Sequence, residues 1–315
     1  MKKITLEKAA SLLLSHDKFK ILTHIYPDGD CLGCGYALAF ALRKLGKQAN
    51  VAVEGALPSK FGYLAEHYEE QDFTPEYIVS VDVAAPSLLG ESVMQGVDHI
   101  DLCIDHHGTN TITADYIYVD SSAAAAAESI WQLLPLLHVE MDEDIAAAIY
   151  TGISTDTGCF CYSNTTSRTH HIAAGVMPFC DWNKINYINF VVKTRAKLKL
   201  ERMILDTMSY YYDGKCAVIY TTLDMCEKLG TGDDEMEGLA SIPRQIEGVQ
   251  MGITMREKAG GVFKISVRTN DGVDASAFCK LFGGGGHPAA AGCSVEGDLE
   301  TVRDKLVTAA GDFLR

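Results

Sequence analysis

The chain has 315 residues, of which 47% are hydrophobic and 22% are charged, and its formal net charge is −15 at pH 7. This composition is typical of a globular protein with about two domains and excludes a largely disordered chain. The acidic balance argues against binding to duplex nucleic acid or to an anionic membrane, because both depend on many Lys and Arg contacts. Binding of an anionic substrate would require a local positive charge, such as a metal ion or a small cluster of hydrogen-bond donors.

The N-terminal sequence predicts a cytoplasmic protein. Glu7 and Lys8 interrupt the apolar run that a secretory signal requires, and no apolar run approaches the ~18 residues of a membrane span. The ten cysteines are scattered, so we expect reduced core thiols. Cys31 and Cys34 form a C-x-x-C pair, but its context suits neither a zinc ribbon nor a thioredoxin site.

In chain order, short apolar strands alternate with amphipathic helices through the first half of the sequence. Helices are expected at 5–15, 30–45, 121–134 and 143–155, and strands at 19–23, 48–53, 77–81 and 99–104. This alternation predicts an α/β domain with a mostly parallel sheet flanked by helices.

A long helical pattern follows at 182–212 and carries the main cationic cluster of the sequence, which is Lys193, Arg195, Lys197, Lys199 and Arg202. This cluster is either a solvated helix face or a lining for phosphates. Strands are then expected at 216–221, 249–256 and 262–268, helices at 274–281 and 299–313, and a glycine loop at 283–286. The pattern predicts a smaller second α/β domain.

Three predicted strands of the first domain end in side chains that bind metals. The strands are followed in turn by His24, Asp28 and Asp30, by Asp82, and by Asp105, His106 and His107. Ligands of a parallel sheet bind outside the carboxyl ends of its strands, so these side chains are expected to converge. Asp156 follows a helix in a segment of small residues that allows close approach.

The types of ligand indicate the metal. Several carboxylates with one or two imidazoles, and no thiolate, favour Mn²⁺ or Mg²⁺ over structural zinc. The number of acids suggests two ions, and two-metal sites commonly hydrolyse phosphate esters. Any one of these residues alone has an ordinary structural explanation, and only the joint pattern carries the prediction.

These motifs resemble those of the DHH phosphoesterases, in the order of that family. His24-Ile-Tyr-Pro-Asp28-Gly-Asp30 resembles the first motif, Asp82 the second, Asp105-His106-His107 the third and Asp156 the fourth. The segment Phe282-Gly-Gly-Gly-Gly-His287 resembles the GGGH signature of the DHH-associated domain of RecJ-like and NrnA-like members. The resemblance implies a DHH catalytic domain at 1–190, a linker helix at 191–213 and a DHH-associated substrate-binding domain at 214–315, with the active site in an interdomain cleft.

The resemblance also implies roles for individual residues. One metal would be held by His24, Asp28 and Asp82, and the other by Asp30, Asp82, His106 and Asp156. His107 would face the scissile phosphate, and Asp105 would orient His106. Cys34 departs from the Ser that the family usually has after Gly33, and a small polarisable residue can fill that place.

The glycine loop has a physical interpretation of its own. Successive glycines let backbone N–H groups surround an anion without a charged side chain. We therefore expect Gly284, Gly285, Gly286 and His287 to bind a substrate phosphate. Arg268 matches a family arginine that meets this phosphate, and its fork-shaped guanidinium suits the contact.

The implied activity is hydrolysis of short 5′-phosphorylated oligoribonucleotides (nanoRNA) to mononucleotides, of 3′-phosphoadenosine-5′-phosphate (pAp) to AMP, or of both. Two divalent ions are expected, with Mn²⁺ favoured and Mg²⁺ or Co²⁺ as alternatives, and the chain is a candidate homodimer. A phosphodiesterase for linear or cyclic dinucleotides remains an alternative. A pyrophosphatase should lack the GGGH domain, and a nucleotide-binding module without catalysis should have lost a metal ligand.

Overall fold

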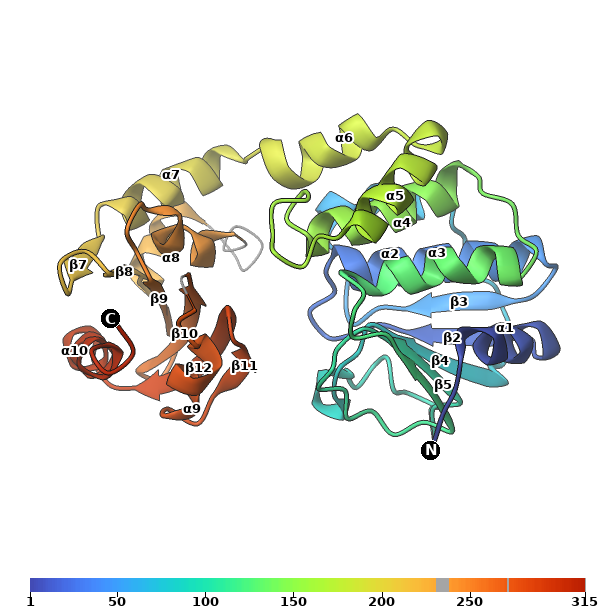
Figure 1. Cartoon of the computed structure of the whole chain (residues 1–315), viewed down its shortest axis with the longest axis horizontal. Coiled ribbons are helices and arrows are strands. Elements are labelled where there is room, and N and C mark those ends of the chain that lie inside the picture. Colours follow the sequence, from blue (N-terminus) through green and yellow to red (C-terminus); the bar gives the residue numbers. More distant parts are fainter. Residues whose placement is uncertain (231–237, 271, 315) are drawn as a thin grey trace. The chain divides into compact units, whose positions relative to one another are not determined.

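The computed structural model describes residues 1–230, 238–270 and 272–314, and it divides into two compact units, Met1–Val192 and Lys193–Arg315. Figure 1 shows the first unit in blue to green and the second in yellow to red. Each unit has its own six-stranded sheet and its own hydrophobic core. The α/β architecture predicted from the sequence is therefore confirmed.

The sheet of the first unit has the order β1-β6-β5-β4-β2-β3, and all its neighbouring strands are parallel. Its strands are β1 (Lys2–Lys3), β2 (Phe19–Leu22), β3 (Ala49–Ala52), β4 (Tyr77–Val81), β5 (Leu102–Asp105) and β6 (Tyr116–Val119). From β2 the chain passes to β3 on one side and then to β4 on the other. The carboxyl ends of β2 and β4 thus flank the topological switch point, where ligands of such sheets bind.

The two faces of this sheet are covered differently. One face packs on the helices α1 (Leu6–Ser15), α2 (Gly29–Lys44) and α3 (Ala126–Leu136). Helix α4 (Glu143–Asp156) packs on α2 and α3, and α5 (Ser167–Val176) packs on α4. The other face packs on residues 83–100 and 112–114, all of them described, which contain the 3₁₀ turn η2 (Pro86–Leu88) and no α-helix. Ile21 and Leu22 show the alternation, because the first joins the helical core and the second the opposite core.

The long helix expected at 182–212 is not continuous, so that prediction was wrong. Helix α6 (Trp182–Asn186) leads into the π-helical turn η4 (Tyr187–Val191), and α7 (Arg195–Leu205) starts anew. Thr194 is extended, and its hydroxyl accepts a hydrogen bond from the Lys197 N–H at 2.9 Å. A threonine that caps a helix favours a break over a continuous helix.

The sheet of the second unit has the order β11-β12-β10-β9-β8-β7 and is antiparallel except between β8 and β9. Its strands are β7 (Ser209–Tyr211), β8 (Cys216–Thr221), β9 (Met251–Lys258), β10 (Val262–Thr269), β11 (Gly285–His287) and β12 (Ala290–Glu296). The sequence predicted β8, β9 and β10 but missed the β11–β12 hairpin.

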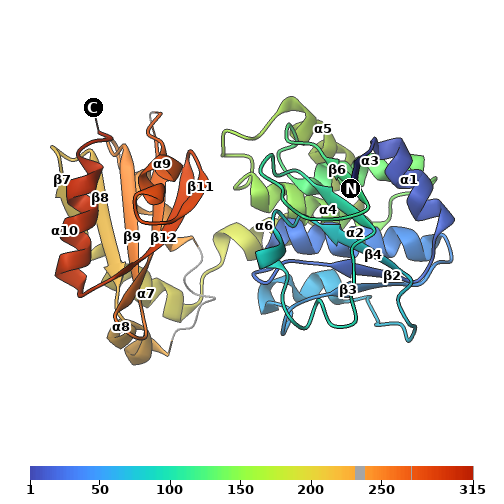
Figure 2. The same cartoon turned by 90° about the horizontal axis from the view of Figure 1, so that it is seen from below.

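Helices α9 (Ala275–Lys280) and α10 (Leu299–Ala310) share one core with one face of the second sheet (Figure 2). On the opposite face, Leu200 and Ile204 of α7 pack on Ile219 of β8. The short helix α8 (Leu223–Leu229) lies against α7. Val267 of β10 belongs to the core under α9 and α10, so the alternation along the strand places Arg268 on the opposite face.

Candidate metal centre

The predicted metal ligands of the first unit converge at the carboxyl edge of its sheet. Each of three groups has ligand atoms within 4.8 Å of one another, and the groups are His24, Cys31 and Asp82; Asp82, His106 and His107; and Asp30, His106 and Asp156. Asp82 and His106 each belong to two groups, so the three form one continuous cluster. Its position after β2, β4 and β5 is the switch-point edge that the topology predicts.

Asp82 lies at the centre of the cluster in an unusual environment. It follows β4 directly, has a positive φ of 54° and is only 4% exposed. Its N–H donates to the Ile104 carbonyl at 3.0 Å, which fixes the turn, but its Oδ1 has no hydrogen-bond partner. Burial and the neighbouring acids, Asp30 first, raise the pKa of Asp82 well above its ordinary value. A buried, orphaned carboxylate oxygen fits a position that binds a cation.

Asp30 has a structural role that the sequence did not predict. Its two carboxylate oxygens accept hydrogen bonds from the N–H groups of Ala126 at 2.6 Å and Ala127 at 3.0 Å. These are the first residues of α3, so Asp30 caps a helix that begins 96 residues later. Oδ2 retains a further lone pair, so the cap is compatible with a metal ligand.

Asp156 closes the cluster from the end of α4. Its Oδ2 lies 3.6 Å from Nε2 of His106. Burial and the charge of Asp30 raise the pKa of Asp156 to about 8. A cation beside Asp156 would reverse this effect and favour the ionised carboxylate.

Gly152 allows α4 to approach the cluster. A Cβ atom at this position would come within 2.7 Å of Asp30 Oδ1. The close approach expected for this small-residue segment is therefore present.

The orientation of His106 is set by the backbone. Its Nδ1 donates to the Ala123 carbonyl at 3.1 Å, because a carbonyl oxygen only accepts, and Nε2 faces the carboxylates of the cluster. Nε2 lies 3.5 Å from Asp82 Oδ1 and 3.9 Å from Asp30 Oδ2. A carbonyl partner that fixes the tautomer in this way is common for histidines that bind metals.

The carboxylate of Asp105, which was expected to orient His106, contacts the side chain of His107, whereas Nδ1 of His106 bonds to the Ala123 carbonyl. Oδ1 of Asp105 pairs with Nδ1 of His107 at 2.8 Å, and its Oδ2 accepts from Asn110 Nδ2 at 2.6 Å. Burial opposes its charge, but the hydrogen bonds and charge of His107, together with Asn110, hold the pKa of Asp105 below its usual value. Asp105 therefore positions His107. Asn110 was missed, although its place five residues after Asp105 in a polar loop is a weak signal for such a partner.

His24 and Asp28 approach the cluster from the β2–α2 connection. Asp28 caps α2 by accepting from the N–H groups of Asp30 at 3.1 Å and Cys31 at 3.0 Å, and its Oδ1 lies 3.7 Å from His24 Nε2. The thiol of Cys31 is buried beside His24 and Asp82, although the sequence predicted no thiol among the ligands. The thiol of Cys34 donates to Asp30 Oδ1 at 3.6 Å.

The predicted phosphate-binding residues lie in the second unit. Arg268 and His287 both pair with Ala290, so they lie in one row of the sheet. The glycine loop does not form the expected nest throughout, because Gly284 N–H donates to the Cys279 carbonyl at 2.9 Å and so helps to end α9. A Cβ at Gly284 would come within 2.2 Å of the Gly292 oxygen, so close packing on β12 requires this glycine.

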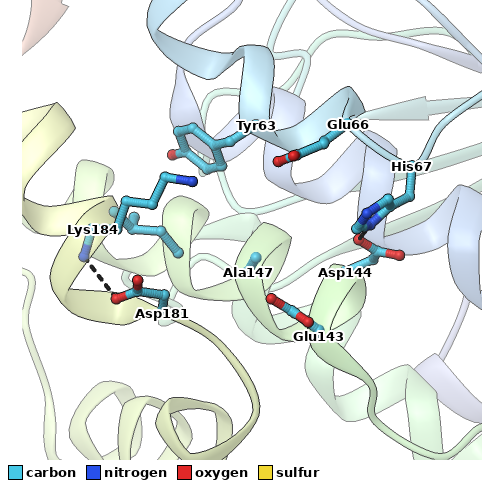
Figure 3. A pocket seen from close by; sticks show the side chains of 9 residues that line it. Tyr63, Glu66, His67, Glu143, Asp144, Ala147, Asp181 and Lys184 are labelled. Carbon is cyan, nitrogen blue, oxygen red and sulfur yellow. Dashed lines mark hydrogen bonds and ion pairs between the residues drawn. The ribbon is translucent and has the colours of Figure 1, made fainter.

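A separate hollow of about 70 Å³ lies at the other end of α4 (Figure 3). It is acidic, and its lining residues are Tyr63, Glu66, His67, Glu143, Asp144, Ala147, Asp181, Lys184 and Ile185. His67 pairs with Asp144 at 2.8 Å. None of the predicted site residues lines this hollow, so the sequence motifs and the acidic hollow are distinct features.

Both units match known protein domains. The model of the DHH family, N-terminal domain, matches residues 18–153, and that of the DHHA1 domain matches residues 215–315. The fold resembles an exopolyphosphatase-related protein from Bacteroides fragilis, with a TM-score of 0.86, 22% identity and coverage of 96% and 95% of the two chains. It also resembles exonuclease RecJ bound to manganese, with a TM-score of 0.51, 15% identity and coverage of 98% and 95%.

The parallel sheet, the second mixed-sheet unit and the two matched domains together define a phosphoesterase. The chain belongs to the DHH family of phosphoesterases. It is 31% identical to the bifunctional oligoribonuclease and PAP phosphatase NrnA of Thermus thermophilus, over 93% of this chain and 89% of that protein. It is 25% identical to NrnA of Bacillus subtilis, over 89% and 90%. Among the described residues, no helix is long and apolar enough to cross a membrane.

Proposed function

We propose that this phosphoesterase cleaves the P–O3′ bond of short 5′-phosphorylated substrates, releasing mononucleotides from nanoRNA and AMP from pAp. The observation that carries the proposal is the cluster around Asp82, whose buried Oδ1 lacks a hydrogen-bond partner at the switch point of the sheet. The names of the relatives support this class of substrate. The low share of cations in the chain also favours short substrates, because long RNA requires a basic track.

Two divalent cations, with Mn²⁺ favoured, are the proposed cofactors. His24, Asp28 and Asp82 would hold one ion, and Asp30, Asp82, His106 and Asp156 the other. When bound, such ions supply Lewis-acid charge that activates water and stabilises the phosphoryl oxygens. The oxygen-rich donor set supports Mn²⁺, and so does the manganese of the structurally similar RecJ.

His107 is the proposed donor to the scissile phosphate. Its Nδ1 is held by Asp105 at 2.8 Å, which leaves Nε2 as the nitrogen that can face substrate. From this position Nε2 of His107 would donate to the charge that develops on the phosphate oxygens. Asn110 occupies the second oxygen of Asp105 and thereby keeps that carboxylate in place.

The second unit is proposed to bind the terminal phosphate of the substrate. Arg268 and His287 present donors from one row of the sheet, with Gly284, Gly285 and Gly286 forming the backbone beside His287. Arg268 would supply a charged, bidentate contact, which suits a dianionic phosphate. On this proposal, residues 1–190 carry the hydrolysis and residues 214–315 select substrates with a 5′-phosphate.

The test is a comparison of initial rates on pAp, pApA, a five-nucleotide RNA, cyclic di-AMP and pyrophosphate, with Mn²⁺ present. We expect hydrolysis of the first three and little of the last two. Asp82→Asn should abolish hydrolysis, while the control Asp115→Asn, which alters an exposed acid before β6, should retain it. Preference for cyclic di-AMP would replace the proposal with a dinucleotide phosphodiesterase. Full activity in excess chelator would contradict the metal site.

A further inference from the structure

The thiol of Cys31 lies among the proposed metal ligands rather than in the apolar core alone. Its Sγ, a ring nitrogen of His24 and a carboxylate oxygen of Asp82 all lie within 4.8 Å of one another. Cys31 is fully buried. Asp82 is 4% exposed, and its Oδ1 has no hydrogen-bond partner. The group thus combines a sulfur, a nitrogen and an oxygen donor with an unsatisfied buried carboxylate.

We propose that His24, Cys31 and Asp82 form a mixed-donor site for a thiophilic divalent cation of the Zn²⁺ class, with Cys31 as a thiolate ligand. The inference rests on the proposed function, because it shares His24 and Asp82 with the first Mn²⁺ position. A thiophilic cation at this site would compete with Mn²⁺ for His24 and Asp82. Enzyme that holds such a cation would therefore be inhibited.

The dimensions of the group suit such an ion. A tetrahedral zinc site has Zn–S and Zn–N distances of ~2.3 and ~2.0 Å, which place neighbouring ligand atoms roughly 3.3–3.8 Å apart. Ligand atoms within 4.8 Å of one another need to move inward by about 1 Å or less to reach this geometry. Small rotations about side-chain bonds accommodate such movements.

The present contacts of the thiol are weak and compete poorly with a metal. Cys31 Sγ accepts from the His24 N–H at 3.3 Å and donates to the Val81 carbonyl at 3.5 Å. On binding, the sulfur forms a bond to the cation and the thiol proton leaves to the solvent. Sulfur ligands select Zn²⁺ and Cd²⁺ over Mn²⁺, because the softer ions form the stronger bonds to thiolate.

Cys34 provides a matched control on the same helix. It is also fully buried, but its thiol donates to Asp30 Oδ1 at 3.6 Å and belongs to none of the ligand groups found among the described residues. The partly exposed Cys159 and the exposed Cys161 form a C-x-C pair, and two neighbouring thiols are a potential second binding site for Cd²⁺. Both are therefore replaced by Ser in every protein that is compared.

The experiment titrates Cd²⁺ into the chelator-treated full chain and follows the ultraviolet thiolate-to-cadmium charge-transfer band. We expect one band of stoichiometric amplitude in the Cys159→Ser/Cys161→Ser protein and after a further Cys34→Ala change. Cys31→Ala and Cys31→Ser should each lose it. Competition with a zinc indicator should show Zn²⁺ affinity lowered more than about 10-fold by Cys31→Ser, with a much smaller change for Mn²⁺.

Mn²⁺-dependent hydrolysis by the same Cys159→Ser/Cys161→Ser preparation separates this inference from the proposed function. If that protein hydrolyses pAp with Mn²⁺ but shows no charge-transfer band, the thiolate site is refuted and the phosphoesterase proposal stands. A band that survives Cys31→Ala also overturns the inference. Circular dichroism of each variant checks folding, and the Cys31→Ser variant covers the case in which Cys31→Ala leaves a disruptive cavity.

Discussion

Arg268 on β10 and His287 on β11 both pair with Ala290 of the intervening strand β12. Residues directly opposite one another in antiparallel strands point to the same face, so these two side chains share a face, with Cα atoms roughly 10 Å apart. Long polar side chains at this spacing reach a common phosphate group. The row therefore supplies a concrete hypothesis for how the second unit recognises substrate.

Arg268→Ala should weaken the use of substrates that carry a 5′-phosphate. A charge-assisted hydrogen bond contributes ~1.5–3 kcal/mol, which corresponds to about a 10- to 150-fold loss of kcat/KM. The loss should be larger for pAp than for the same molecule without its 5′-phosphate. Lys264→Ala is the control, since Lys264 lies on the same strand and face as Arg268. Equal losses for both substrates would show that Arg268 does not bind that phosphate.

Substitutions of Asp30 and of Asp82 should have different effects on the free energy of unfolding when it is measured without metal. Asp30 accepts two N–H groups at the start of α3, so Asp30→Ala should cost ~0.5–2 kcal/mol or more through the lost cap. Asp82 Oδ1 has no hydrogen-bond partner and its carboxylate is crowded by other acids, so Asp82→Asn should leave stability equal or higher. Urea denaturation in chelator measures both, and a large loss for Asp82→Asn would contradict the orphaned state of its oxygen.

Asp105→Asn should lower kcat and leave KM nearly unchanged. The change removes the charge that holds His107 but retains the size of the side chain. Positioned acid–base groups contribute ~10²–10⁴-fold, so a loss in this range is expected. Asn110→Ala should give a smaller loss, because it removes only the second partner of Asp105. If Asp105→Asn instead raises KM alone, its role lies in binding substrate.

Chelator-treated protein should lose stability as pH rises. The folded-state pKa of Asp156 is about 8, because burial and Asp30 disfavour its charge, while an unfolded Asp has a pKa of ~3.9. The folded protein therefore holds this proton more tightly, and the resulting stabilisation is complete below pH ~4 and is lost as pH rises toward 8. Asp82 acts in the same direction.

Melting temperatures at pH 5 to 9, with and without Mn²⁺, measure this dependence. Stabilisation by Mn²⁺ should grow with pH, because protons compete with the cation for the same carboxylates. The Asp156→Asn variant should show a flatter profile in chelator. A wild-type profile that is already flat in chelator would contradict the crowded-carboxylate interpretation.

The value of kcat/KM should fall as the RNA substrate grows beyond about five nucleotides. This fall should be steeper at low salt, where the repulsion between RNA phosphates and the acidic protein is less screened. The cluster at 193–202 gives limited compensation, since Lys193 pairs with Glu201 at 2.9 Å. Rates on RNAs of two to twenty-four nucleotides at two salt concentrations test this expectation. Duplex DNA should not be cleaved. Rates that climb with length would instead indicate a basic track and a processive nuclease.

The sequence alone determined which predicted strands end in metal-binding side chains, and it indicated the class of chemistry. Strand β4 is a run of apolar residues that ends at Asp82, and β5 is followed directly by His106 and His107. Both features can be recognised within a few residues of sequence. A buried parallel strand is a run of mostly apolar residues, and the residue that follows this run marks the carboxyl end of the strand. The convergence of the strand-end residues then follows from the parallel arrangement alone.

Only the tertiary structure decided which side chains support one another. The cap of Asp30 on α3, the orientation of His107 by Asp105 and the place of Cys31 beside Asp82 depend on how side chains pack in space. Residue spacing sets the order of groups along the chain, but a hydrogen bond needs distance and angle within a few tenths of an ångström and a few tens of degrees. These are properties of the packed helices and loops, which sequence periodicity does not encode.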